Sequence, residues 1–333
     1  MVNLVEAQKP LLHGLVKLAG LRQLTVEIEP GTVMTFWVPK DKIPKKKNVT
    51  KEIFPVGKTS VVGSGNNDGM IKRRKKEKPA VVLVHGFAAE GIVTWQFQVG
   101  ALTKHYSVYV PDLLFFGGST TGVAGRLPEF QAECLAAALG LLGVTVCTVV
   151  GFSYGGMVAF KMAEARPDLV KAIVVSGSVI AMTDSISAET MERLGFSSSK
   201  ELLLPETVKG LKALLKVAAY KKLWFPDFLH RDYLKVMFNN RNERAELLEA
   251  LVISNKQDDH PPPLTQNILL LWGENDNIFN LELAKTMKDQ LGDKATLQSI
   301  NKAGHLVHLE RPCVYNRRLK EFLALVNPQA TNE

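Results

Sequence analysis

Residues 151–156 read Gly-Phe-Ser-Tyr-Gly-Gly, which places Ser153 between two glycines. A β-branched apolar run, Val144–Val150, precedes them, and helix-forming residues follow as far as Pro167. The run has the length and composition of a buried strand. A Gly-x-Ser-x-Gly turn between a strand and a helix holds the serine on a sharp bend with its hydroxyl exposed. Glycine suits such a turn because it has no Cβ to crowd it. Ser153 is therefore a candidate nucleophile.

A serine hydroxyl is a weak nucleophile and needs a histidine base that a carboxylate orients. The predicted strand Asn267–Trp272 leads into Asp276, and the last predicted strand leads into His305. In open α/β sheets, functional groups gather at the carboxyl ends of the strands. We therefore expect Ser153, Asp276 and His305 to form a catalytic triad, in the chain order Ser, Asp, His.

Two of these positions have a competitor nearby. Glu274 competes with Asp276, although a solvated turn carboxylate is the simpler interpretation of Glu274. His308 competes with His305. His305 is favoured because it directly follows Gly304 in a loop that can reach the serine, whereas His308 is expected inside the next helix.

Acyl transfer also requires two N–H donors aimed at the negative oxygen of the tetrahedral intermediate. The backbone of Tyr154, directly after the candidate nucleophile, is the first expected donor. The second is expected from the backbone of Phe87, in the loop that follows the predicted strand Val81–Val84. In that loop Gly86 permits a tight turn, and His85 is expected to orient the loop rather than to react.

Short apolar runs alternate with helical patterns along much of the chain, which indicates βαβ units and a mostly parallel sheet of eight strands. The predicted strands are Thr25–Glu29, Val33–Val38, Ala80–His85, Ser107–Pro111, Val144–Val150, Lys171–Ser176, Asn267–Trp272 and Ala295–Ile300. The predicted helices between them are Val93–Lys104, Glu129–Gly140, Tyr154–Arg166, Leu281–Gln290 and Arg311–Leu325.

The alternation breaks in one region, and this gives the expected domain organisation. Residues 1–24 are predicted to be a helical segment, and 25–179 with 263–333 form the α/β core. Residues 180–262 are predicted to be helical throughout. Because they lie between two strands, we expect them to form a cap over the ends of the sheet. Residues 40–78 are predicted to be a basic, flexible insertion.

The net charge of +8 comes from that insertion, which has 13 Lys/Arg against 4 Asp/Glu, whereas the rest of the chain has 28 against 29. The insertion has no aromatic platform interleaved with its basic runs, so a solvated loop is expected and nucleic-acid binding is not. Contact with anionic lipid heads is the alternative. An apolar stripe between Leu4 and Ala19 could also lie on a membrane, although a helix packed on the domain is the favoured interpretation.

The remaining composition indicates a cytoplasmic protein. The three cysteines, Cys134, Cys147 and Cys313, have neither CxxC nor zinc-site spacing, which favours a reducing compartment. No apolar run is long enough to span a bilayer, and the N-terminus lacks the pattern of a signal peptide. No metal or cofactor is expected.

Five segments together resemble the α/β-hydrolase superfamily over roughly residues 25–325. The likeness is to its capped branch, which includes monoacylglycerol lipase-like proteins, epoxide hydrolases and C–C bond hydrolases. The chain is also similar to plant hydrolases that share its segment 88–96. The five segments are His85-Gly-Phe, Pro111-Asp-Leu-Leu-Phe-Phe-Gly-Gly-Ser119, Gly151-Phe-Ser-Tyr-Gly-Gly156, Trp272-Gly-Glu-Asn-Asp276 and Ala303-Gly-His-Leu-Val-His-Leu-Glu-Arg-Pro312.

The chain departs from this family at two positions. Epoxide hydrolases of the branch have an aspartate at the position of Ser153, so the serine excludes their covalent chemistry. Family members often have a proline four residues after the catalytic acid, and this chain has Asn280 at that position. The difference affects the geometry of the turn after Asp276 but not its charge.

The resemblance implies a serine esterase or lipase that acts on an uncharged ester of an apolar acyl or aromatic acid. Most apolar residues of the predicted cap are expected to form its core, and some of them to line a pocket over the serine. These residues are Leu202, Leu203, Leu204, Leu211, Leu214, Leu215, Trp224, Phe225, Phe228, Met237 and Phe238. One alternative is hydrolysis of a C–C bond in a β-diketone-like substrate by the same triad. Another is a ligand receptor built on a hydrolase body.

Overall fold

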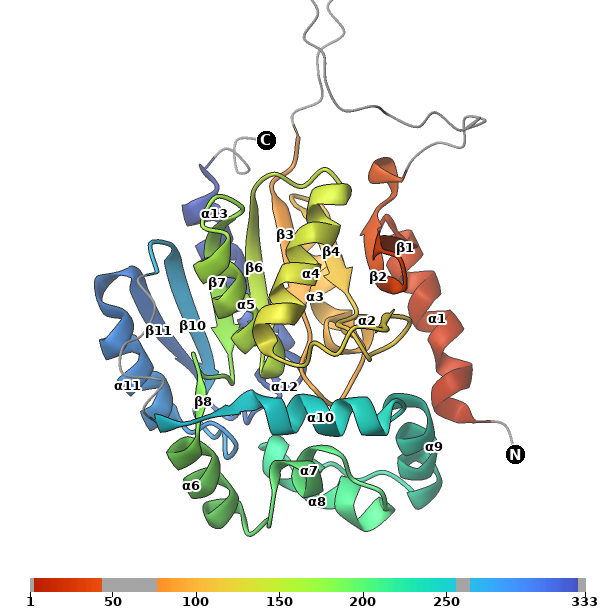
Figure 1. Ribbon diagram of the computed structural model, residues 1–333, viewed down its shortest axis with the longest axis vertical. Coiled ribbons are helices and arrows are strands. Elements are labelled where there is room, and N and C mark those ends of the chain that lie inside the picture. The colour runs from red at the N-terminus through yellow and green to blue at the C-terminus, as the bar shows by residue number, and fades with distance from the viewer. Residues whose placement is uncertain (1–2, 44–76, 256–263, 329–333) are drawn as a thin grey trace, which may run out of the picture.

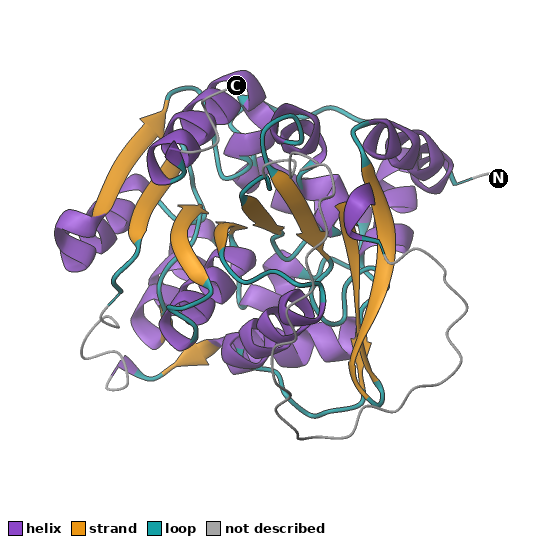
Figure 2. Cartoon of the chain, turned by 90° about the horizontal axis from the view of Figure 1, so that it is seen from above, coloured by secondary structure: helices purple, strands orange, loops and turns teal. Residues whose placement is uncertain are grey.

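The computed structural model describes residues 3–43, 77–255 and 264–328. Most of the basic insertion predicted at 40–78, and the last residues of the predicted cap, lie outside these ranges. The described residues form one large sheet with helices on both of its faces (Figure 2). A further group of helices lies beyond one end of the strands (Figure 1).

The large sheet confirms the expected α/β fold with a mostly parallel sheet of eight strands, in the order β1-β2-β4-β3-β6-β7-β10-β11. The two-residue strand β5 is an addition that pairs with β2. The pairings of β2 with β1, β4 and β5 are antiparallel, and the other neighbours are parallel. The strands are β1 Leu21–Glu29, β2 Thr32–Pro39, β3 Ala80–Val84, β4 Ser107–Pro111, β5 Thr120–Thr121, β6 Cys147–Phe152, β7 Val170–Ser176, β10 Asn267–Gly273 and β11 Ala295–Ile300.

The central strands read as continuous apolar runs because both of their faces are buried. In β3, Val82 and Val84 belong to one hydrophobic core, and Val81 and Leu83 belong to the other. The first core includes residues of α4 Pro128–Leu141, α5 Tyr154–Ala165 and α11 Leu281–Leu291. The second includes residues of α1 Leu4–Leu18, α2 Gly91–Thr94, α3 Gln96–Leu102, α12 Val307–Glu310 and α13 Pro312–Val326. Two short 3₁₀ helices, Lys40–Lys42 and Gly292–Lys294, complete these elements.

Five helices of the described chain, between β7 and β10, lie beyond the carboxyl ends of the strands (Figure 1). The chain enters and leaves this region through two short strands, β8 Met182–Thr183 and β9 Val252–Ile253, which pair in parallel. The prediction that 180–262 is helical throughout was therefore wrong at these strands. The five helices are α6 Asp184–Leu194, α7 Ser199–Leu203, α8 Val208–Ala218, α9 Asp227–Met237 and α10 Arg241–Leu251.

Glycines with positive φ explain two boundaries that the sequence analysis placed wrongly. Gly20 has φ +91° after α1, and the next residue already pairs in β1, so the N-terminal helical segment stops short of residue 24. Gly143 has φ +74° after α4, and the Val144 N–H donates to the carbonyl of Leu139. Because that N–H closes the helix, β6 begins at Cys147 rather than at Val144.

Helix α1 contacts β1, α3 and α9. Its Val16 is buried, but Leu11, Leu15 and Leu18 are more than half exposed. None of the helices in the described ranges combines the length and the apolar composition needed to cross a bilayer.

Candidate active site

The candidate nucleophile Ser153 lies between β6 and α5 with φ +53° and ψ −123°, a conformation that is rare for a residue with a side chain. Its backbone is fixed from two sides. The Ser153 N–H donates to the carbonyl of Ser176 at 2.9 Å, and the Ser178 hydroxyl donates to the carbonyl of Ser153 at 2.7 Å. The serine therefore sits on a strained turn that the segment after β7 holds in place.

The glycines on either side of Ser153 are required by close backbone contacts. A Cβ at Gly151 would lie 2.4 Å from the carbonyl oxygen of Gly155. A Cβ at Gly155 would lie 2.4 Å from the carbonyl oxygen of His85, in the loop after β3. Real Cβ atoms do not come this close to backbone oxygens. Only glycine at these two positions therefore permits the turn to close and to pack against the loop after β3.

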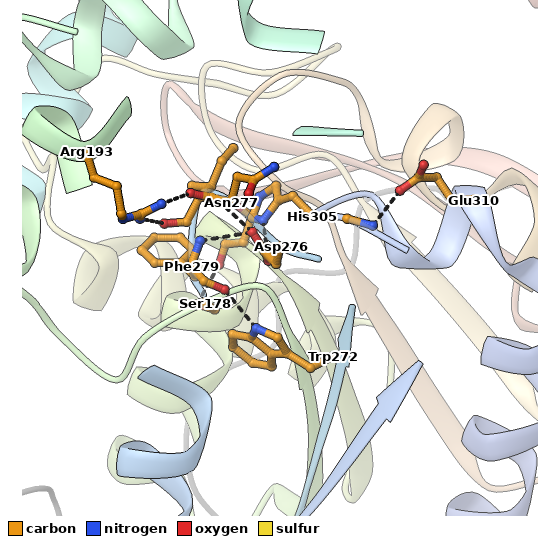
Figure 3. Close-up of polar contacts among 11 residues, drawn as sticks. Ser178, Arg193, Trp272, Asp276, Asn277, Phe279, His305 and Glu310 are labelled. Atoms are coloured by element: carbon orange, nitrogen blue, oxygen red, sulfur yellow. Dashed lines mark hydrogen bonds and ion pairs between the residues drawn. The ribbon is translucent and has the colours of Figure 1, made fainter. Parts of the chain in front are cut away.

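His305 and Asp276 form a buried pair beside this turn (Figure 3). The distance from His305 Nδ1 to Asp276 Oδ2 is 2.9 Å. The other carboxylate oxygen, Oδ1, accepts the N–H groups of Ile278 and Phe279 at 2.8 and 2.9 Å. Because the carboxylate accepts at Nδ1, that nitrogen carries the proton of the neutral ring and Nε2 is left as the base.

Aromatic rings fix the plane of the His305 imidazole. The ring of Phe152, which directly precedes Ser153, lies 4.9 Å from it between centroids, and the ring of Phe279 lies 5.9 Å from it. Trp272 in turn fixes the segment of Phe279, because its Nε1–H donates to the Phe279 carbonyl at 2.9 Å. The structure has no hydrogen bond between the Ser153 hydroxyl and His305. Catalytic hydrogen bonds are often long in free enzymes and shorten when substrate binds.

Gly177 is a residue of this site that the sequence analysis missed. It has φ +54°, and a Cβ there would lie 2.7 Å from His305 Nδ1 and 3.1 Å from Asp276 Oδ2. The chain after β7 therefore passes directly against the hydrogen bond between the histidine and the aspartate. Only the Ser-Gly-Ser composition of residues 176–178 signalled a tight turn, and this did not reveal what the turn contacts.

Gly177→Ala is expected to lower ester turnover by about 100-fold or more, because the new methyl group must displace the His305 ring or the turn below Ser153. The matched control is Gly143→Ala, since Gly143 has a similar positive φ but a Cβ added there would have no atom within 4 Å. Both variants strain the backbone, so their unfolding temperatures should fall alike. Equal kcat values in the two variants would contradict the placement of Gly177 against the pair.

The two residues expected to supply the oxyanion donors are in contact with each other. The rings of Phe87 and Tyr154 are in edge contact at 5.8 Å between centroids. Within the described residues, neither backbone N–H donates a hydrogen bond: Tyr154 is the first residue of α5, and Phe87 lies in the turn after β3. Both donors are therefore free for an incoming oxygen.

His85 orients the loop that carries Phe87. The Leu113 N–H donates to His85 Nε2 at 2.9 Å, so Nδ1 carries the proton and donates to the carbonyl of Gly86 at 2.7 Å. Burial lowers the pKa of His85 to about 4. The ring therefore stays neutral near pH 7 and keeps this pair of hydrogen bonds.

The two competing residues lie away from the pair. His308 is fully buried against the rings of Trp95, Phe152 and Tyr315, and neither of its ring nitrogens has a hydrogen-bond partner. Burial, and next the charge of His305, lower its pKa to about 3. Glu274 accepts a hydrogen bond from the Ser299 hydroxyl at 3.0 Å, on the exposed side of the sheet edge.

A pocket opens on Ser153 beneath the inserted helices. Among the described residues, its polar side chains are the hydroxyls of Ser153, Ser187, Thr190 and Ser199 and the phenol of Tyr154, and none of its lining side chains is charged. The remaining lining is apolar and comes from the loop after β3, helices α5, α6, α7 and α10, strands β8 and β9, and the loop after β10. These residues are Phe87, Met157, Met182, Met191, Leu202, Leu203, Leu248, Leu251, Val252, Ile278 and Phe279.

Two charged residues outside the pocket form hydrogen bonds to the loops that carry Asp276 and His305. No pattern in the sequence predicted either contact. Arg193 of α6 donates to the carbonyls of Asn277 and Ile278, beside Asp276. Glu310 accepts from the Gly304 N–H at 2.7 Å, beside His305 (Figure 3). The described chain contains no group of three or more His, Cys, Asp or Glu side chains arranged to hold a metal ion.

Comparisons with known proteins agree with this architecture. A family profile described as "alpha/beta hydrolase fold" matches residues 79–202, and a second, described as "TAP-like protein", matches residues 244–332. Epoxide hydrolase 4 of Homo sapiens is 24% identical over 286 residues, covering 75% of this chain and 73% of the human protein.

A second relative has a different reaction in its name. The 2-hydroxy-6-oxononadienedioate/2-hydroxy-6-oxononatrienedioate hydrolase of a Pseudomonas species is 25% identical over 254 residues, covering 73% of this chain and 87% of that protein. Among solved structures, a bacterial membrane phospholipase A superposes with a TM-score of 0.72 at 22% identity, covering 97% of this chain and 91% of that one. At this identity the structural likeness establishes the fold, and the relatives' names differ in the bond that is cleaved.

Proposed function

Because the chain belongs to the α/β-hydrolase superfamily, we propose that it is a serine hydrolase that cleaves uncharged carboxylic esters of apolar acids. The observation that carries this proposal is that Ser153 lies in the wall of an apolar pocket, to which the described part of the chain contributes no charged side chain. The buried hydrogen bond between His305 and Asp276, beside the turn of Ser153, supports it.

In the proposed mechanism, His305 Nε2 removes the hydroxyl proton of Ser153 as the oxygen attacks the ester carbonyl. Asp276 keeps the proton of the histidine on Nδ1 and stabilises the imidazolium that forms. The N–H groups of Phe87 and Tyr154 bind the negative oxygen of the tetrahedral intermediate. Its collapse breaks the ester C–O bond, and His305 gives its proton to the departing alcohol.

The second half of the reaction repeats these steps with water. His305 removes a proton from a water molecule, whose oxygen attacks the acyl carbonyl on Ser153. A second tetrahedral intermediate forms on the same two N–H groups. It collapses to the free acid as His305 returns the proton to the serine oxygen, so the enzyme ends in its starting state.

Two relatives point to other bonds, and residues of this chain favour an ester over both. An epoxide hydrolase of this branch needs an aspartate where this chain has Ser153. A C–C bond hydrolase with a dioate substrate, such as the Pseudomonas relative's name describes, needs a cation for the carboxylates. The nearby guanidinium groups are occupied: Arg244 donates to Phe115, Met237 and Asn239, and Arg193 donates to the loop of Asp276.

A series of p-nitrophenyl esters from acetate to octanoate tests the substrate class. We expect kcat/KM to rise with chain length, because each CH₂ buried in the pocket contributes up to about 0.8 kcal/mol, or nearly fourfold, until the pocket is full. The matched control is a hemisuccinate ester against the butanoate ester. The added carboxylate should lower kcat/KM sharply, since no cation lines the pocket.

Other outcomes would identify the alternatives. Equal kcat/KM values across the ester series, together with rapid cleavage of a vinylogous β-diketone acid, would replace the esterase proposal with C–C bond hydrolysis. A single turnover followed by a stable complex would favour a ligand receptor.

A further inference from the structure

The loop between α8 and α9 carries a cluster of exposed apolar side chains, which we call the α8–α9 surface. Its five large residues fall within nine positions of the chain, and Trp224 is 83% exposed. The other three tryptophans, at positions 37, 95 and 272, are buried. Water contact with this much apolar surface is unfavourable, so the cluster points to a bound partner. Its residues are Tyr220, Leu223, Trp224, Phe225 and Phe228.

The same region is positively charged. Residues 209–235 contain seven Lys/Arg and two Asp/Glu, although the chain outside the basic insertion is nearly neutral. Lys221 and Lys222 stand between the exposed apolar residues, and Lys216 lies in the last turn of α8. Of the α8 and loop lysines, Lys212 pairs with Asp227, while the others have no ion pair within the described residues.

This combination fits the surface of an anionic bilayer. Tryptophan and tyrosine favour the level of the lipid head groups, where the apolar part of the ring contacts hydrocarbon and its N–H or O–H group contacts water. Leucine and phenylalanine are stabilised by entering the acyl region, and each lysine near an anionic surface adds a favourable electrostatic attraction. A protein partner with an acidic, apolar groove would meet the same residues, but would not require tryptophan and tyrosine beside the lysines, a combination that suits a bilayer surface.

We propose that the α8–α9 surface docks the protein on an anionic lipid bilayer. Docking places the bilayer next to the loop of His305, because the Leu306 N–H donates to the carbonyl of Ala218 at 3.2 Å. Glu310 extends this link, since its carboxylate accepts the N–H groups of Lys221 and Gly304 at 3.1 and 2.7 Å. The docking does not depend on the proposed hydrolysis, and its test measures binding separately from turnover.

The experiment is binding of the full-length protein to vesicles of phosphatidylcholine with or without phosphatidylserine, at low and at high salt. We expect sedimentation with the anionic vesicles that weakens as salt screens the lysines. Tryptophan emission should shift to shorter wavelength on binding and should lose this shift in Trp224→Phe, because the other three tryptophans are already buried.

Three sets of variants locate the contact. Replacing Leu223, Trp224 and Phe225 together with serine should weaken vesicle binding at least tenfold. Replacing Lys221 and Lys222 with glutamine should weaken it by about tenfold at low salt and little at high salt. The matched control replaces three exposed apolar residues on other faces with serine: Leu141, Val146 and Leu325.

Three other outcomes would overturn the proposal. A loop variant that sediments like the native protein would remove the α8–α9 surface from the contact. Loss of binding on replacing Leu11, Leu15 and Leu18 instead would assign it to α1. Self-association without lipid that the loop variant abolishes would assign the surface to a second copy of the chain. Unchanged melting temperature and unchanged turnover of a soluble acetate ester in the loop variant would show that neither folding nor catalysis was lost.

Discussion

Ser153→Ala is expected to lower ester turnover by a factor of about 10⁴ to 10⁶, because the acyl-enzyme can no longer form. The fold should persist, since the alanine removes one oxygen and the backbone of residue 153 is held by the Ser176 carbonyl and the Ser178 hydroxyl. The measurement is kcat with p-nitrophenyl butanoate for purified protein, with the unfolding temperature alongside it.

Ser178→Ala is the matched control for that variant. It also removes one hydroxyl within the site, but the Ser178 hydroxyl donates a hydrogen bond to the carbonyl of Ser153 and has no role in the proposed reaction. We expect a loss of about 1 kcal/mol in stability and a modest fall in kcat. More than a few per cent of native activity in Ser153→Ala, in protein made without a contaminating esterase, would remove Ser153 from the proposed role.

His305→Ala is expected to lose activity to nearly the same extent as Ser153→Ala, because members of a triad act as a unit and their losses do not add. The double variant should therefore be no less active than either single variant. The measurement is kcat for the two single variants and the double variant under one set of conditions.

His308→Ala is the control for the base, since it removes the other imidazole of the same motif. His308 is buried and its low pKa keeps it neutral. Its replacement should therefore leave most of the activity, while the cavity left behind lowers stability by about 2 kcal/mol. Rates should be compared at a temperature where both variants are folded. A larger loss of kcat in His308→Ala than in His305→Ala would move the proposed base to His308.

The sequence predicted the sheet well because its central strands are buried on both faces and therefore read as continuous apolar runs. It predicted the Asp276 and His305 positions because both follow strands that end at one edge of the sheet. The boundary errors at residues 20 and 143 came from positive-φ glycines, whose backbone conformation a hydrophobic pattern does not reveal.

Contacts between distant segments could not be predicted in this way. Gly177 lies against the His305–Asp276 pair, and Arg193 supports the turn of that aspartate from an inserted helix. Neither position has a periodic pattern or a neighbouring motif that would signal its partner. The α8–α9 surface was missed for a related reason. Trp224 and Phe225 are apolar and were expected in the core of the cap, and the sequence does not show that their side chains are exposed.

Covalent labelling tests the central claim, that Ser153 is an activated nucleophile, most directly. The protein is treated with a fluorophosphonate, and the site of labelling is found by mass spectrometry of the intact chain and of its peptides. We predict one label per chain, on the peptide that contains Ser153, with labelling strongly slowed in His305→Ala and little changed in His308→Ala. A label on another residue, or no label in protein that turns over an ester, would contradict the account.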